Sequence, residues 1–461
     1  MRHGYSPVLA LTALCLIAGF WRLGSKSLWF DETVSATYAH MTFGGLWHVI
    51  TGPDPNMSVY YVLLWVWGHI FGYGAFALRS LDVLLGCLSV PLIVAIGGRL
   101  FDRTVGLVAG GLLAISPCFV LVEQTARSYA LVVLFTLLAT YCFLRARDAP
   151  TPSRLTAYVA ACVLGAYAHY FALIIIVVHA LVVAMDTRQH RRYLTRWVAC
   201  GAIILLAFIP EAVVAARHGQ NTAWIGVPSV SALVRFPEFL AGSQIARLGT
   251  LATGLFVVCC IYQLVSGRSG RDSRSTWFVA AWLVIPVLLT FVESHLAQSF
   301  WQNDYMIEVL PAFLLLAAAG AVHAPNRQVA IATLVILGAL QLAELHRLVE
   351  TPQFENWQRA AGYVLTHESD SDRIIYVPGF SQEPFAYYAR QDGHSLPKRL
   401  APAGLLSGVA HPPRLWVVVK SNSAGAPSET RDLSRGLSGY VQSSAQAFAA
   451  APEVRLYVTR N

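Results

Sequence analysis

The sequence predicts an all-α protein that crosses a membrane many times and ends in a small α/β domain. The chain has 461 residues, of which 56% are hydrophobic and only 13% are charged. Soluble domains carry about a quarter charged residues, so a soluble globular protein is excluded. The net charge of +8 would suggest nucleic acid in a soluble chain. In a membrane protein, basic residues instead gather on one side of the bilayer, so no nucleic-acid partner is expected.

A membrane helix needs about 20 mostly apolar residues, and eleven segments are predicted to cross the bilayer. They are residues 7–22, 77–99, 104–121, 128–145, 155–168, 170–186, 196–214, 248–265, 276–292, 304–322 and 329–345. The first lacks a small-x-small cleavage site, so we interpret it as an uncleaved span and not as a signal peptide. All eight cysteines lie in apolar runs without metal-ligand spacing, which indicates packing residues.

One apolar segment, Ser58–Phe71, is too short to cross. Its 14 residues would rise only about 21 Å as a helix, against a hydrocarbon core of about 30 Å. Its tyrosines and tryptophans suit the headgroup region. We therefore predict an interfacial helix, ended by Gly72 and Gly74, within an outer loop over residues 23–76.

The arginines predict which loops face the cytoplasm. Thirteen of them fall in one set of loops: Arg99, Arg103, Arg145, Arg147, Arg154, Arg188, Arg191, Arg192, Arg196, Arg268, Arg271, Arg274 and Arg327. Only four, Arg127, Arg217, Arg235 and Arg247, fall in the alternate set. The positive-inside rule assigns the first set to the cytoplasm of a cytoplasmic (inner) membrane. The loops 23–76, 121–128, 215–247 and 293–303 and the C-terminal tail are then extracytoplasmic.

The chain is expected to divide into a membrane domain, residues 1–345, and an extracytoplasmic domain, residues 346–461. The tail alternates helical and strand-like patterns, which predicts the α/β domain. Its expected helices are Trp357–Leu365, Glu383–Arg390 and Ser428–Ala450, and its expected strands are Arg373–Val377, Leu415–Lys420 and Val454–Val458. No phosphate loop or ligand cluster occurs there, so we expect acceptor recognition or structural support.

Two adjacent carboxylates, Asp31 and Glu32, directly follow the first span in the sequence Leu28-Trp-Phe-Asp-Glu. One interpretation is structural, since acids at the start of a helix interact favourably with its positive end. The other is catalytic, with one carboxylate acting as a general base toward an acceptor hydroxyl. Adjacent residues on a helix point about 100° apart, so only one could be the base.

A second group of polar residues occupies the predicted outer turn between the third and fourth spans. Arg127 is its only basic residue, and Glu123 and Tyr129 flank it. An arginine at the bilayer surface either snorkels to the headgroups or pairs with a lipid phosphate. The nearby acid and tyrosine favour a binding site.

Further candidate binding residues lie in other predicted outer turns: Asp54 and Asn56, Tyr60, His169, Asn303 and Tyr305. For each of them a structural alternative stays open, namely a plain turn, a satisfied polar group or an aromatic anchor at the membrane interface. No HxxxH, CxxC or spaced acidic repeat occurs, so no metal site is predicted. A divalent cation stays the alternative, because loops could bring three oxygens together.

Several motifs in this order resemble the GT-C glycosyltransferases. They are WFDE after the first span, DPN-x-x-x-YY-x-LLW-x-W, FG-x-x-x-x-x-LR, SP-x-x-x-x-x-x-x-x-AR-x-Y, and a late Tyr followed by Leu-Pro. Within that family, the chain is most similar to bacterial relatives of protein O-mannosyltransferases and of lipid A aminoarabinose transferases. The resemblance covers residues 7–345 well and the tail more loosely.

This resemblance implies a GT-C fold and the transfer of a hexose or pentose from a polyprenyl-phosphate carrier to an acceptor hydroxyl outside the cytoplasmic membrane. Asp31 would be the base, with Glu32 beside it, and Arg127 and Tyr129 would lie near the carrier phosphate. The acceptor would be a glycan, a lipid or a protein. Two positions depart from the family pattern: Asn56-Met57-Ser58 stands where many relatives have HPP, and Asp304 stands where they have Arg.

Two other functions are weighed against glycosyl transfer. A transporter or lipid-linked sugar flippase would show internal repeats, broken helices and ionisable residues at the bilayer midplane, whereas this chain has its acids at the predicted outer boundary. An inactive relative that only binds a lipid-linked sugar is the second alternative, because of the altered HPP site.

Overall fold

The computed structural model describes residues 6–54, 56–185, 193–218, 224–243, 246–267, 273–351, 355–396, 398–400, 412–420, 426–449 and 451–460. The chain forms two compact units. The helical unit comprises Met1–Trp21, Thr42–Leu64 and Arg79–Glu350, and the mixed unit comprises Arg22–Met41, Trp65–Leu78 and Thr351–Asn461. The predicted outer loop thus contributes two segments to the same unit as the C-terminal tail.

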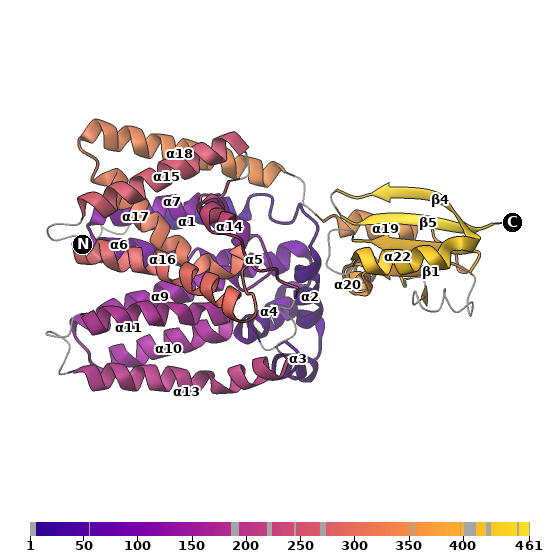
Figure 1. The fold of residues 1–461 in the computed structure, drawn as a ribbon, viewed down its shortest axis with the longest axis horizontal. Coiled ribbons are helices and arrows are strands. Elements are labelled where there is room, and N and C mark those ends of the chain that lie inside the picture. The colour runs from indigo at the N-terminus through magenta and orange to yellow at the C-terminus, as the bar shows by residue number, and fades with distance from the viewer. Residues whose placement is uncertain are drawn as a thin grey trace. The chain divides into compact units, whose positions relative to one another are not determined.

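The helical unit consists of long, closely packed helices (Figure 1). They are α1 (Ser6–Phe20), α3 (Phe43–Ile50), α6 (Ser89–Leu100), α7 (Arg103–Ala114), α8 (Pro117–Glu123), α9 (Tyr129–Asp148), α10 (Pro152–Ala168), α11 (Ile174–Met185), α13 (Leu194–His218), α14 (Val230–Leu240), α15 (Ala246–Ser266), α16 (Ser273–Leu296), α17 (Leu310–Val322) and α18 (Arg327–Glu350). Short 3₁₀ segments, η2 (Tyr170–Leu173) and η5 (Asn303–Val309), precede α11 and α17. Helices α4 (Ser58–Phe71) and α5 (Ala75–Gly86) have residues in both units.

The prediction of an all-α multi-pass membrane protein is confirmed. Among the described residues, seven helices are long and apolar enough to cross a membrane, or eight if α7 and α8, bent by 56°, form one span. The other three predicted spans, 7–22, 155–168 and 170–186, correspond to the shorter helices α1, α10 and α11. Helix α4 has the bounds predicted for the interfacial helix.

Helix α17 forms the centre of the helical core. Every residue from Leu310 to Ala321 is buried, and the helix contacts α7, α15 and α16. Its small residues permit close approach of neighbouring backbones, as is usual for helices in lipid. A Cβ atom at Gly320 would overlap the carbonyl oxygen of Cys259 in α15.

Contacts also gather the predicted cytoplasmic loops at one end of the helical unit. Arg99, at the end of α6, forms an ion pair with Asp148, at the end of α9. His323 Nε2, after α17, lies 3.1 Å from Asp102 Oδ2, before α7. Helix α9 has 20 residues and is therefore about 30 Å long. Its other end begins at Tyr129, among the candidate site residues.

The mixed unit contains a five-stranded sheet in the order β2-β1-β3-β5-β4. The strands are β1 (Arg373–Val377), β2 (Lys398–Arg399), β3 (Arg414–Val419), β4 (Tyr440–Ala447) and β5 (Glu453–Thr459). β1 pairs with β2 and β3 in parallel, and β5 pairs with β3 and β4 antiparallel. The helices of this unit are α2 (Phe30–His40), α19 (Trp357–His367), α20 (Gln382–Gln391) and α22 (Ala426–Gly436), the last three beside the sheet in Figure 1.

The predicted helix over Ser428–Ala450 is wrong in its second half. Helix α22 ends at Gly436, and residues 440–447 form the edge strand β4, which pairs with β5. The sequence YVQSSAQA has weak intrinsic preferences. Its conformation is therefore decided by tertiary pairing with β5, which sequence periodicity does not report.

A matched pair of glycines tests the packing of α17. We expect Gly320→Ala to lower stability by about 1–3 kcal/mol, because its methyl group has no space against Cys259. Gly338→Ala, in α18, has no atom within 4 Å of the new Cβ and should be neutral or stabilising. Thermal unfolding in detergent measures both, and equal midpoints for the two variants would contradict this packing.

Candidate active site

The turn between α8 and α9 places Arg127 within the helical unit. Ser116 Oγ accepts a hydrogen bond from the Phe119 amide at 3.3 Å, which caps α8. In the turn that follows this helix, Arg127 is half-buried, and its Nη1 donates to the Tyr61 hydroxyl at 3.1 Å. The same hydroxyl lies 3.4 Å from Asp54 Oδ2. A guanidinium, a phenol and a carboxylate are therefore linked in one chain of contacts.

Tyr60 and Tyr61 have different environments because neighbours on a helix point about 100° apart. Tyr61 contacts Arg127, whereas the fully buried Tyr60 donates to Asp82 Oδ2 at 2.9 Å. Asp82 is fully buried as well. The structure thus places the predicted residue Tyr60 in a buried pair and brings Tyr61, which the sequence reasoning had missed, to the arginine. The adjacent YY pair was the only available signal.

The turn after α10 brings His169 against Tyr129 and Tyr305. The His169 ring centroid lies 5.0 Å from that of Tyr305 and 6.2 Å from that of Tyr129. His169 Nδ1 accepts from the Phe171 amide at 3.4 Å, so the proton of the neutral ring is on Nε2. Burial, with a smaller effect of the Arg127 charge, lowers the pKa of His169 to about 3, so the ring is neutral at pH 7.

The Nε2 atom of His169 is buried and has no hydrogen-bond partner among the described residues. Buried donors are nearly always satisfied in folded proteins, so this donor suits a bound water or a ligand. Asn56 lies close by, because its Oδ1 accepts from the Tyr170 amide at 3.4 Å. The predicted residues Asn56, Tyr129, His169 and Tyr305 therefore lie in one region of the helical unit.

Glu123 is not part of this cluster in the contacts that the structure describes. Its carboxylate is fully buried and accepts from Cys15 Sγ of α1 at 3.4 Å. A Cβ at Gly19 or Gly86 would come against the same carboxylate. The sequence suggested that Glu123 lies beside Arg127. In the structure α8 is bent away from α7, and the Glu123 side chain points toward α1.

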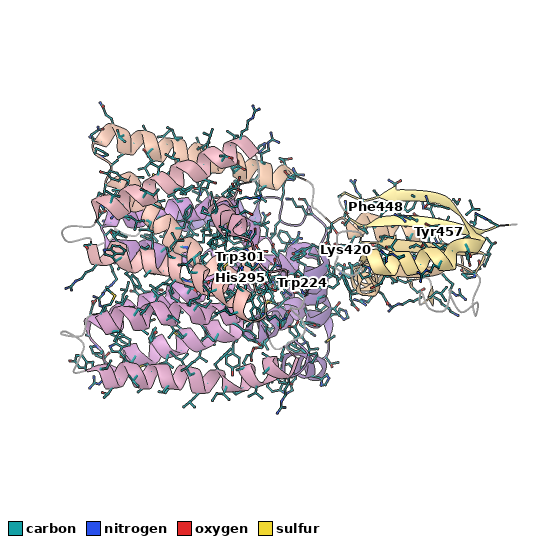
Figure 2. All side chains as sticks on the ribbon, viewed as in Figure 1. Trp224, His295, Trp301, Lys420, Phe448 and Tyr457 are labelled. Atoms are coloured by element: carbon teal, nitrogen blue, oxygen red, sulfur yellow. The ribbon has the colours of Figure 1, made fainter. Side chains whose placement is uncertain are left out.

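An open cleft of about 770 Å³ adjoins the same region. Its lining includes Asn303 and Asp304, directly before Tyr305, and Ser231, Arg235 and Glu238 of α14. Trp301, labelled in Figure 2, lines it too. The exposed Arg235 was not predicted as a site residue, since a single arginine in a predicted outer loop is a weak signal.

The opposite face of α14 lines an apolar groove of about 310 Å³. Leu233, Phe236, Pro237 and Leu240 contribute to it, together with apolar side chains of α15, α16 and α17. The spacing of these residues is that of one helix face, and Arg235 and Glu238 belong to the other face. Helix α14 thus separates a polar cleft from an apolar groove.

Asp31 and Glu32 lie in the first turn of α2, in the mixed unit. Glu32 is fully buried, and its Oε2 accepts from the Trp29 amide at 3.1 Å, which caps the helix. Asp31 is half-buried at the adjacent position. Of the two carboxylates, Glu32 has the structural role, and Asp31 is the one partly accessible to a ligand.

No group of three or more His, Cys, Asp or Glu residues that could hold a metal ion occurs within the described parts of the chain.

Residues 55–221 match the family model of dolichyl-phosphate-mannose-protein mannosyltransferases. No curated protein sequence matches the chain. Among solved structures, the chain is similar to ArnT from Cupriavidus metallidurans bound to undecaprenyl phosphate, with a TM-score of 0.62, 14% identity and 98% of each chain covered. The chain has the GT-C fold.

Two other GT-C structures are similar to this chain. The mycobacterial arabinofuranosyltransferase AftD matches with a TM-score of 0.56 and 15% identity over 99% of this chain and 40% of that chain. The Archaeoglobus fulgidus oligosaccharyltransferase, in complex with zinc and sulfate, matches with a TM-score of 0.56 and 11% identity over 95% and 72%. At these low identities, the TM-scores above 0.5 show a shared fold alone.

Proposed function

We propose that this chain is a membrane glycosyltransferase that moves a sugar from a polyprenyl-phosphate carrier to an acceptor hydroxyl on the outer side of the cytoplasmic membrane. The observation that carries the proposal is the pairing of a polar cleft with an apolar groove on the two faces of α14. A lipid-linked sugar needs this combination, since its sugar and phosphate are polar and its isoprenoid chain is apolar. The undecaprenyl phosphate bound to ArnT supports the same donor class.

Arg127 and Arg235 are the proposed partners of the donor phosphate. As the bond between the anomeric carbon and the phosphate oxygen breaks, negative charge grows on the phosphate, and a fixed cation in a low-dielectric site stabilises it. The contact with Tyr61 holds the Arg127 guanidinium in place. The carboxylates of Glu238 and Asp304 in the cleft suit sugar hydroxyls, and the unpaired Nε2–H of His169 is a donor suited to a phosphate or sugar oxygen.

Asp31 is the proposed general base. It removes the proton of the acceptor hydroxyl as that oxygen bonds to the anomeric carbon, and polyprenyl phosphate leaves from the opposite face. Direct attack inverts the anomeric configuration. Glu32 is engaged with the Trp29 amide, which favours Asp31 for the proton transfer. Supply of the sugar on a lipid carrier suits a site outside the cell, where nucleotide sugars are absent.

Replacement of Asp31 tests the base. Asp31→Asn should lower transfer by about 10²- to 10⁴-fold, the usual contribution of a general base. Folding should persist, since the buried cap is Glu32. A strain lacking the gene is complemented with the variant, and mass spectrometry follows the envelope glycan that the deletion removes.

The exposed Asp370, in the same unit, supplies the matched control, and Asp370→Asn should restore the glycan fully. Recovery of the glycan at wild-type rate with Asp31→Asn, at equal protein level, would exclude Asp31 as the base.

Replacement of Arg235 tests the lipid site. Arg235→Gln should weaken the binding of undecaprenyl phosphate by about 10- to 100-fold, because a charge-assisted hydrogen bond to the phosphate is lost. Binding is measured on the purified chain in nanodiscs by thermophoresis. Arg217→Gln, an exposed arginine of α13 outside the cleft, is the control and should bind like wild type. Equal affinity of both variants would remove the cleft from the donor site.

A further inference from the structure

A buried carboxylate of the C-terminal tail binds the first turn of α2. Glu355 is only 4% exposed, and its Oε2 accepts from the Phe30 amide at 3.1 Å and from Trp357 Nε1 at 2.5 Å. Phe30 is the first residue of α2, and Asp31 follows it directly. The first amides of a helix have no partner within the helix, so an external carboxylate there fixes the position of the helix end.

Lys420 neutralises this carboxylate. Its Nζ lies 2.6 Å from Glu355 Oε1, and its side chain is only 12% exposed. The ammonium also lies 5.2 Å from the centroid of the Phe30 ring, a cation–π contact. The Lys420 amide donates to the carbonyl of Val377 at 2.8 Å, which joins Lys420 to the sheet directly after β3.

Helix α20 holds the residues before α2 in the same way. The Leu28 amide donates to the Tyr388 hydroxyl at 2.6 Å, and Ser27 Oγ donates to that hydroxyl at 3.1 Å. The Phe30 and Phe380 rings pack with centroids 4.9 Å apart. Side chains of the tail thus bind the amides of Leu28 and Phe30, which lie three positions and one position before Asp31.

We propose that Glu355, Lys420 and Tyr388 are positioning residues that orient Asp31 for proton transfer. The inference rests on the proposed function and assigns the C-terminal tail a role in it. Buried ion pairs contribute little net stability, since desolvation offsets their attraction, and their best-attested use is to specify geometry. The direction of the Asp31 carboxylate follows from the backbone at Phe30, so displacement of that backbone misplaces the base.

The first test replaces Lys420 by methionine, which keeps the stem over Phe30 but leaves the Glu355 carboxylate unpaired. A misplaced catalytic group lowers turnover, so Lys420→Met should reduce kcat about 10- to 100-fold with KM for the lipid-linked donor within about twofold. Glu355→Gln combined with Lys420→Met removes both charges and should recover part of kcat relative to Lys420→Met alone.

A second variant tests the positioning role without leaving a buried charge unpaired. Tyr388→Phe removes only the hydroxyl that binds Leu28, and it should lower kcat without changing KM. Hydrogen exchange on the full chain should show faster exchange of the amides of residues 28–33 in both variants, with unchanged exchange in β1 and β3. A purely structural role would lower the amount of folded protein and leave kcat per folded molecule unchanged.

The control is the Glu453–Arg455 pair of β5, joined at 2.9 Å in the same unit. Glu453→Gln should leave both kcat and the exchange of residues 28–33 as in wild type. If Asp31→Asn is inactive while Lys420→Met and Tyr388→Phe keep wild-type kcat, the positioning role is wrong and the proposed function stands. Full activity of Asp31→Asn would overturn both.

Discussion

Apolar helices cannot carry unpaired charge through a lipid bilayer, and this constraint organises the whole helical unit. The described arginines of the predicted cytoplasmic loops lie at helix ends, and contacts such as that of Arg99 with Asp148 join those loops. At the other end of α9, turns and short helices bring Arg127, Tyr129, His169 and Tyr305 into one region. The polar chemistry available to a ligand is therefore concentrated where helices begin and end.

In two pairs of adjacent residues, side chains of similar chemistry have different hydrogen-bond partners. Glu32 caps α2 through the Trp29 amide, and the half-buried Asp31 is the proposed base. Tyr60 donates a hydrogen bond to Asp82, whereas Tyr61 accepts one from Arg127. In each pair the rotation of about 100° between helix neighbours places the two side chains in different environments. The α2 end is in turn held by the tail through Glu355, so the small domain is part of the proposed catalytic arrangement.

The sequence predicts those parts of the fold that depend on composition and on the spacing of apolar residues along the chain. Helices lie at the predicted apolar segments, and among the described residues seven or eight of them are long and apolar enough to cross a membrane. The bounds of α4 and the strands β1, β3 and β5 also followed from patterns local to the chain. The side of a helix that faces a given neighbour depends on tertiary packing. The sequence therefore could not show that Tyr61, and not Tyr60, contacts Arg127. The bend after α7 turns Glu123 into the core, and the strand β4 depends on its partner β5. Arg235 lines the cleft because α14 has one polar and one apolar face, a property that a single arginine in a predicted loop does not indicate.

The proposed function requires that the chain break the bond between a sugar and a polyprenyl phosphate. The most direct measurement is phosphorus NMR of the purified chain in liposomes that contain sugar-linked lipids and acceptors extracted from the native membranes. We predict that the phosphodiester signal of the donor falls while the phosphomonoester signal of free polyprenyl phosphate rises. The amount of glycosylated acceptor should rise at the same rate. An unchanged phosphodiester signal, with the sugar-linked lipid moving between leaflets, would contradict glycosyl transfer and indicate a flippase.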